Sequence, residues 1–328
     1  MRSGFLSLAL IIAVTACVDD TAPANGGNTE QATSAFYLGQ PLPGMKPEIF
    51  APGLVSSPDK RELNAVFSPD GREFYFARQI GEAYKTFVMH RQADGDWSTP
   101  QMASFSATNT EWDEVDMWFS PDGDALYYIS NAPASGFAGG SVNIWRVSRA
   151  ESGWGMPEAL PAPVNSDADE LYPLPTNSGA FYFASSRDGG LGGRDVYVVQ
   201  EDGGKFTGVR NLGQMVNSPA SDSDAYVSPD EQFMIVTAHR PEGLGGADMY
   251  YIARSEGGDW GEPVNLGAPV NSADHDYTPI VTADRCFFFF TRNGDIYWVS
   301  AQLVLKHLGE SVDDACKADA WLENGNNG

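Results

Sequence analysis

The chain has 328 residues, of which 42% are hydrophobic and 12% aromatic, so it can bury one large core. Its formal net charge is −24, from 44 acidic and 20 basic residues. This charge argues against nucleic acid or an anionic membrane surface as a partner, whereas cations, basic proteins and neutral sugars stay compatible.

Residues 1–16 have the pattern of an export signal. Arg2 precedes an apolar stretch, 5–14, that is too short to span a membrane comfortably. The stretch runs into Val-Thr-Ala-Cys, which resembles the bacterial lipobox, so Cys17 is expected to carry a lipid; a plain secretory signal is the alternative. Residues 17–44 are expected to form a flexible linker. Because Val18 does not resemble an inner-membrane retention signal, the predicted location is the outer membrane, facing the periplasm.

A repeat fills residues 45–301. Pro-Glu-Ile-Phe-Ala-Pro-Gly-Leu-Val-Ser at 47–56 matches Pro-Glu-Ala-Leu-Pro-Ala-Pro-Val-Asn-Ser at 157–166 in step, and related segments follow to make five copies. The turn Ser-Pro-Asp-Gly at 68–71 returns four times, in degraded form in the later copies, at spacings of 52 to 56 residues. Such a period, with several short strands in each unit, is typical of propeller blades.

The sequence of each unit predicts four strands. A short run precedes the turn, an aromatic-rich run follows it, a third run carries β-branched and aromatic residues, and the Trp/Phe-x-x-Pro segment is the fourth. After Asp276 only three strands remain, so residues 47–56 are expected to supply the fourth strand of the last blade. The prediction is an all-β, five-bladed propeller of four-stranded antiparallel blades, closed by its N-terminal strand.

The pattern Glu-x-x-x-x-Phe-Ser-Pro-Asp-Gly, then an aromatic strand, then Asp-Ile/Val/Met-Tyr, resembles the TolB-like (WD40-like) β-propeller repeat of bacterial envelope proteins. The resemblance covers about residues 45–301. It implies an envelope location and a propeller fold, but such propellers carry unrelated activities, so it does not imply a reaction.

When the five copies are aligned on their turns, one carboxylate per blade falls at the start of the innermost strand. These residues are Glu62, Glu114, Glu170, Asp222 and Asp276. In a propeller these starts converge at the mouth of the central channel, where carboxylates repel unless they are paired or protonated. A hydrogen bond from each acid to backbone of the neighbouring blade, a divalent cation such as calcium, and acid–base catalysis are the three interpretations. The repetition in every blade favours the structural one.

Other residues near the predicted mouth are candidate binding residues. They are Asp113, Asp116, Trp118, Asp169, Asp222, Asp224, Asp274 and His275. Trp118 stands where the other blades have Val66, Leu174, Tyr226 and Ile280, and could stack on a sugar or fill the core. The glycine loops 188–195 and 242–248 distantly resemble calcium-binding repeats but occur once per blade, so tight turns are favoured.

Residues 302–328 form a tail beyond the ring. An exported protein can form disulfides, so Cys286 and Cys316 are expected to pair and to fix the tail to the last blade; two separate thiols are the alternative.

Three functions stay open, and the sequence favours a non-catalytic one. The favoured hypothesis is a monomeric, lipid-anchored binding or scaffold module for an envelope protein or glycan. The second is a carbohydrate-active enzyme that would use Glu62, Glu114, Glu170 and Asp276, with carboxylates about 5–10 Å apart beside an open pocket. The third is a cation-stabilised structural protein.

Overall fold

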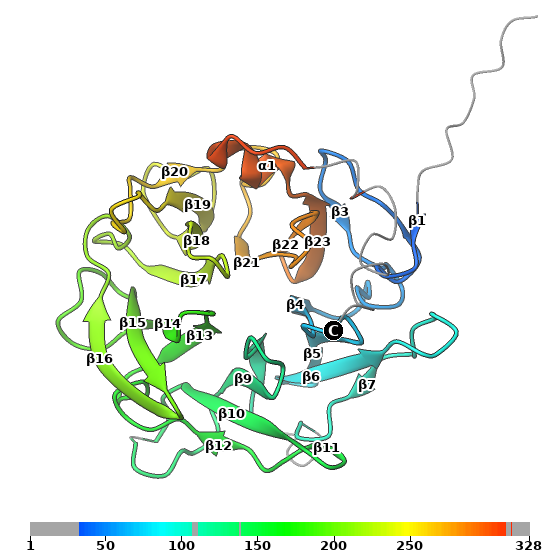
Figure 1. The fold of residues 1–328 in the computed structure, drawn as a ribbon, viewed down its shortest axis with the longest axis horizontal. Helices are drawn as coiled ribbons and strands as arrows, with labels where there is room; N and C mark the ends of the chain where they lie inside the picture. Colours follow the sequence, from blue (N-terminus) through cyan, green and yellow to red (C-terminus); the bar gives the residue numbers. More distant parts are fainter. Residues whose placement is uncertain (1–32, 107–110, 138, 313–315, 317–328) are drawn as a thin grey trace, which may run out of the picture. The chain divides into compact units, whose positions relative to one another are not determined.

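The computed structural model describes residues 33–106, 111–137, 139–312 and 316, which belong to the compact unit Ala32–Gly328. Cys17 and the export signal lie outside the described residues. Five antiparallel sheets are arranged around a central axis, each with its innermost strand nearest that axis (Figure 1). The predicted five-bladed propeller is confirmed.

The blades follow one another in chain order, and each runs outward from its innermost strand. Blade 1 contains β4 (Glu62–Phe67), β5 (Glu73–Ile80), β6 (Ala83–His90) and β7 (Gln101–Met102). Blade 2 contains β8 (Val115–Phe119), β9 (Ala125–Ser130), β10 (Asn143–Ala150), β12 (Glu158–Ala159) and the short extra strand β11 (Gly153–Trp154). Blade 3 contains β13 (Glu170–Pro175), β14 (Ala180–Ser185), β15 (Asp195–Asp202) and β16 (Lys205–Asn211). Blade 4 contains β17 (Asp222–Val227), β18 (Phe233–Ala238), β19 (Asp248–Ala253) and β20 (Val264–Asn265). Blade 5 contains β21 (Asp276–Val281), β22 (Phe287–Arg292), β23 (Asp295–Ser300) and β3 (Glu48–Ile49).

The Ser-Pro-Asp-Gly turn forms the hairpin between the first two strands of blade 1. The Ser68 hydroxyl donates to the Asp70 carboxylate at 2.6 Å and accepts the backbone N–H of Glu73 at 2.9 Å. Gly71 has φ +66°, a conformation that glycine adopts without strain. This face of the ring, where the innermost strands end, is called the turn face below.

The N-terminal strand closes the ring, as predicted. Glu48 and Ile49 of β3 pair with Trp298 and Tyr297 of β23. The next residue, Phe50, is fully buried, and its ring contacts Phe289 of blade 5 at 4.9 Å and Phe74 of blade 1 at 5.5 Å. Phe50 therefore packs between the first and last blades.

The glycine loops join neighbouring blades. The Asp195 carboxylate accepts the backbone N–H groups of Leu191 and Gly192, so it is occupied by its own loop. A Cβ on Gly192 would lie 1.8 Å from the backbone oxygen of Ala220 in the next blade, so only glycine fits there. Asp248 and Gly245 repeat the arrangement. The loops are tight turns, as the sequence favoured.

The segment before the ring differs from the predicted linker. Residues 33–44 include β1 (Thr33–Ser34) and β2 (Gln40–Pro41), and Phe36 and Tyr37 are buried in the aromatic core around Phe50. The Tyr37 hydroxyl donates to Asp284 at 2.6 Å. Two adjacent aromatic side chains bury enough apolar surface to hold this part of the chain on the ring.

The tail begins with α1 (Gln302–Leu305) and a 3₁₀ turn, Lys306–Leu308, whose apolar side chains pack on blades 4 and 5. Cys286 and Cys316 form a disulfide with Cα atoms 5.3 Å apart, which ties the tail to blade 5. None of the helices in the described part of the chain is long and apolar enough to cross a membrane.

Candidate functional site

The five aligned carboxylates are held by the same contacts in four of the blades. Each is buried, accepts the backbone N–H of a serine that ends the outer segment of the preceding blade, and pairs with an arginine at or near the end of the second strand of its own blade. The ion pairs are Glu62–Arg78 at 2.7 Å, Glu170–Arg187 at 3.0 Å, Asp222–Arg240 at 2.9 Å and Asp276–Arg292 at 2.5 Å. The serines are Ser57, Ser166, Ser218 and Ser272.

The arginines extend these contacts across the blade boundary. Each donates to the backbone oxygen of a buried valine in the outer segment of the preceding blade; Arg78 reaches Val55 at 2.7 Å and Arg292 reaches Val270 at 2.7 Å. One carboxylate–arginine pair thus joins each of these blades to the blade before it. We call these pairs the inter-blade ion pairs.

Blade 2 uses a different cation. Its second strand is followed by Asn131, and Glu114 pairs instead with Lys85 of blade 1 at 3.4 Å and accepts the Ser106 hydroxyl. The Lys85 side chain is 1% exposed and also donates to the backbone oxygen of Trp112. The charge balance is preserved, although the cation comes from the preceding blade.

These contacts decide what the aligned acids can do. Burial raises the pKa of Glu62 and Glu114, while hydrogen bonds and the cations Arg78 and Lys85 act in the opposite direction. Carboxylates used in ion pairs and backbone hydrogen bonds have few lone pairs left for a metal or a substrate. The geometry therefore supports the structural interpretation of this ring.

The neighbouring candidates at the mouth have contacts of their own. Asp113 accepts the backbone N–H of Tyr84 at 2.7 Å, and Asp169 accepts that of Val142 at 3.0 Å, so both acids join adjacent blades. Asp274 is exposed. The His275 ring lies 5.2 Å from the ring of His239, and burial and then repulsion by His239 lower the pKa of His275.

Deeper in the channel, every innermost strand carries a β-bulge. The bulge residues all have positive φ, between 40° and 55°, and are at most 9% exposed: Asn64, Asp116, Tyr172, Asp224 and Thr278. A bulge re-aims a side chain, and here it does so at the same position in all five blades. Asp116 and Asp224, predicted at the mouth, belong to this buried polar ring.

Two residues further along, the channel becomes apolar. The equivalent positions are Val66, Trp118, Leu174, Tyr226 and Ile280. The Trp118 ring meets the Tyr226 ring edge-on with centroids 5.8 Å apart, although blades 2 and 4 are not neighbours. Trp118 therefore reaches across the axis, and it packs against three of the four hydrophobic clusters.

Beyond Trp118 lies a cavity of about 200 Å³ that opens on the turn face. All five blades line it, and its walls are mainly aromatic, proline and aliphatic side chains. They include Phe36, Tyr37, Phe67, Trp118, Phe119, Pro121, Pro175, Tyr226, Pro229 and Ile280. We call this cavity the axial pocket.

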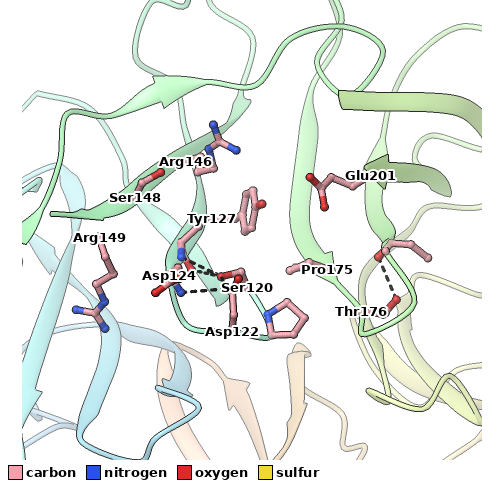
Figure 2. Close-up of a pocket in the computed structure, with 14 residues that line it drawn as sticks. Ser120, Asp122, Asp124, Tyr127, Arg146, Ser148, Arg149, Pro175, Thr176 and Glu201 are labelled. Atoms are coloured by element: carbon pink, nitrogen blue, oxygen red, sulfur yellow. Dashed lines mark hydrogen bonds between the residues drawn. The ribbon is translucent and has the colours of Figure 1, made fainter. Parts of the chain in front are cut away.

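A second, polar hollow of about 480 Å³ lies on the turn face between blades 2 and 3. Figure 2 shows Arg146 and Tyr127 of blade 2 on one side of it and Glu201 of blade 3 on the other. Arg146 is engaged by Glu158 at 2.5 Å, and the dashed lines around Ser120 are the turn's own hydrogen bonds. These polar side chains are thus used in contacts within the protein and do not point together at one place where a ligand would bind.

No protein-family model matches the chain, and no curated protein does either. Among solved structures, TolB from Acinetobacter baumannii is 14% identical with a TM-score of 0.44, over 74% of this chain and 55% of that one. A putative TolB from Agrobacterium tumefaciens is 16% identical with a TM-score of 0.44, over 73% and 72%. The chain resembles TolB-like β-propeller proteins. The tricorn protease is 14% identical with a TM-score of 0.48, over 75% of this chain and 22% of that one.

Sequence reasoning placed Trp118 with the acidic mouth, whereas the structure puts it in the layer below the axial pocket. The sequence shows that Trp118 differs from the residues at the same position in the other blades. How deep its side chain lies in the channel depends on the β-bulge that precedes it. The axial pocket itself was missed. Its one signal in the sequence is that the Ser-Pro-Asp-Gly turns must converge at the end of the channel opposite the aligned acids.

Proposed function

We propose that this TolB-like propeller is a non-catalytic binding module that takes a protein partner on its turn face. The anchor of that partner is an apolar side chain inserted into the axial pocket. The observation that carries the proposal is the pocket itself. All five blades contribute to it, and its floor is Trp118, the largest side chain found at that position in the five blades.

The size of the axial pocket favours a side chain over a sugar chain. Sites for drug-sized ligands occupy about 300–1,000 Å³, and this cavity is about 200 Å³. One or two apolar side chains fill such a volume. Aromatic-lined pockets at the centre of a surface are where protein interfaces concentrate their binding energy.

The charge of the turn face favours basic residues on either side of the partner's apolar anchor. The exposed turn residues Asp70 and Asp122 directly follow Pro69 and Pro121, which line the axial pocket, and the whole chain carries −24. A partner segment with lysine or arginine on both sides of its apolar anchor is complementary to this face. Such complementarity raises the association rate and weakens with added salt.

The inter-blade ion pairs argue against the carbohydrate-active alternative. A glycosidase needs two carboxylates facing an open pocket, and the aligned acids face arginines and backbone amides instead. Envelope location, with a lipid on Cys17 and attachment to the outer membrane, is part of the proposal and rests on the sequence pattern at 14–17.

The test is a selection of displayed peptides against the purified protein, counter-selected against Trp118→Ala. The proposal expects peptides with a large apolar residue between basic residues, and at least about a tenfold loss of affinity for Trp118→Ala. Trp260→Ala, on the outside of blade 4, is the matched control and should bind as the wild type does. A parallel glycan array that gives Trp118-dependent sugar binding, with no peptide enriched, would refute a protein partner.

A further inference from the structure

We propose that the buried polar ring holds a divalent cation, with Ca²⁺ the best fit, between Asp116, Asp224 and Asn64. The site lies on the opposite side of Trp118 from the axial pocket and does not depend on the proposed partner. It also differs from the aligned acids at the mouth, which are already paired.

Two carboxylates face each other in this ring. Asp116 and Asp224 occupy the same bulge position in blades 2 and 4, and the side chains two residues further along, Trp118 and Tyr226, meet across the axis. The carboxylates are 8% and 9% exposed as residues. Two carboxylates buried this close together repel each other, and a cation bound between them would remove that repulsion.

The protein supplies little of that charge. Arg194 is the side chain whose charge acts on both carboxylates, but it is 40% exposed and lies 3.7 Å from Asp169. Asp224 also accepts the backbone N–H of Thr278 at 3.3 Å, and this neutral donor brings no positive charge. Neither contact neutralises two buried carboxylates.

Asn64, which holds the equivalent bulge position in blade 1, is an independent sign of a ligand in this ring. It is 1% exposed, and neither its Oδ1 nor its Nδ2 has a hydrogen-bond partner among the described residues. A buried amide without partners is costly, because it loses its bonds to water and gains none. Its backbone is linked to Asp224 through Thr291 and Thr278, which hydrogen-bond to each other at 2.6 Å.

The donor set selects the kind of cation. Carboxylate and amide oxygens are ligands for hard cations, and two carboxylates balance a divalent charge. Ca²⁺ tolerates irregular geometry and completes its coordination with water, whereas Mg²⁺ demands a near-ideal octahedron. The described residues contain no group of three histidine, cysteine or acidic side chains able to hold a metal. The site proposed here has two carboxylates, and its third protein ligand is the Asn64 amide.

The experiment titrates the chelator-treated protein with CaCl₂ alone and follows heat release and thermal unfolding. The wild type should bind one Ca²⁺ and unfold at a higher temperature with it. Asp116→Asn and Asp224→Asn should each weaken binding at least tenfold, while Asn64→Asp, which adds a third carboxylate, should tighten it about tenfold. Asp274→Asn removes an exposed acid at the mouth and is the control for net charge.

A wild type that takes up no Ca²⁺ would overturn the proposal, and so would equal binding by wild type and Asp116→Asn. If Asp116→Asn and Asp224→Asn are both more stable than the wild type in saturating CaCl₂, the carboxylates share a proton instead of a cation. That result also overturns the proposal. Tighter binding by Asn64→Asp cannot arise from a merely structural role of Asn64.

Discussion

Replacing Arg292 with methionine tests whether the aligned carboxylates serve the fold. Asp276 is fully buried, and the arginine gives it an ion pair at 2.5 Å. The same guanidinium donates to the backbone oxygens of Pro269 at 3.3 Å and Val270 at 2.7 Å. Methionine keeps much of the volume and removes all three contacts.

The expected cost follows from what the substitution leaves behind. Removing one partner of a buried ion pair leaves an uncompensated charge and costs about 3–5 kcal/mol. Asp276 keeps its hydrogen bonds from the N–H and hydroxyl of Ser272, so a value near the lower end is expected. The double variant Arg292→Met/Asp276→Asn removes the stranded charge and should recover part of the loss.

Urea unfolding followed by tryptophan fluorescence measures these free energies. Arg146→Met is the matched control, because Arg146 pairs with Glu158 at the surface, where the side chains are 26% and 57% exposed. Such a pair contributes about 0–1 kcal/mol. If Arg292→Met costs no more than Arg146→Met, the aligned acids do not hold the blades together. The argument that their ion pairs leave them unavailable for catalysis would then also fail.

Two further predictions concern closure and pH. Phe50→Ala should cost about 3–5 kcal/mol, because it empties the contact between the first and last blades. Ile49→Ala, at a residue of β3 that is 38% exposed, should cost under about 1 kcal/mol, and equal losses in urea unfolding would contradict the closure. Burial raises the pKa of Glu231, but hydrogen bonds from Ser178, Thr176, Tyr182 and Arg254 outweigh it and lower the pKa below its usual value. The resulting stability is present above the unfolded-state pKa of about 4.3 and is lost as pH falls through the lower folded-state pKa. Glu231→Gln should therefore cost about 1–3 kcal/mol at pH 7 and flatten the acid limb of the stability–pH curve, and an unchanged acid limb would refute this.

The fold could be predicted because its signals are local and repeated. The turn at 68–71 specifies a hairpin by its own hydrogen bonds, and its return every 52 to 56 residues specifies blades. The missing fourth strand after Asp276 and the echo at 47–56 together required closure by the N-terminal strand. None of these inferences needs information about distant contacts.

The site was harder to predict because it depends on features that the repeat conceals. Non-glycine residues hold the positive φ of each bulge, so nothing in the sequence marks Asn64 or Asp116 as re-aimed. In blade 2 the arginine is missing, and Lys85 of blade 1 supplies the cation for Glu114 instead. An alignment of the blades does not show this, because Lys85 lies in a different blade from its partner. The axial pocket exists only after the ring has closed, since each blade contributes just a few side chains to it.

Closure by β3 also imposes an order on the protein's assembly. Glu48–Ile49 leave the ribosome early, but their partner Asp295–Ser300 is among the last parts of the ring to be made. Until then the outer edge of blade 5 does not exist, and an emerging chain has an unpaired N-terminal segment that can join the sheet of another copy. A chain interrupted before residue 295 thus has a free N-terminal strand and no acceptor for it, so the ring stays open to pairing with another copy until its last blade is made.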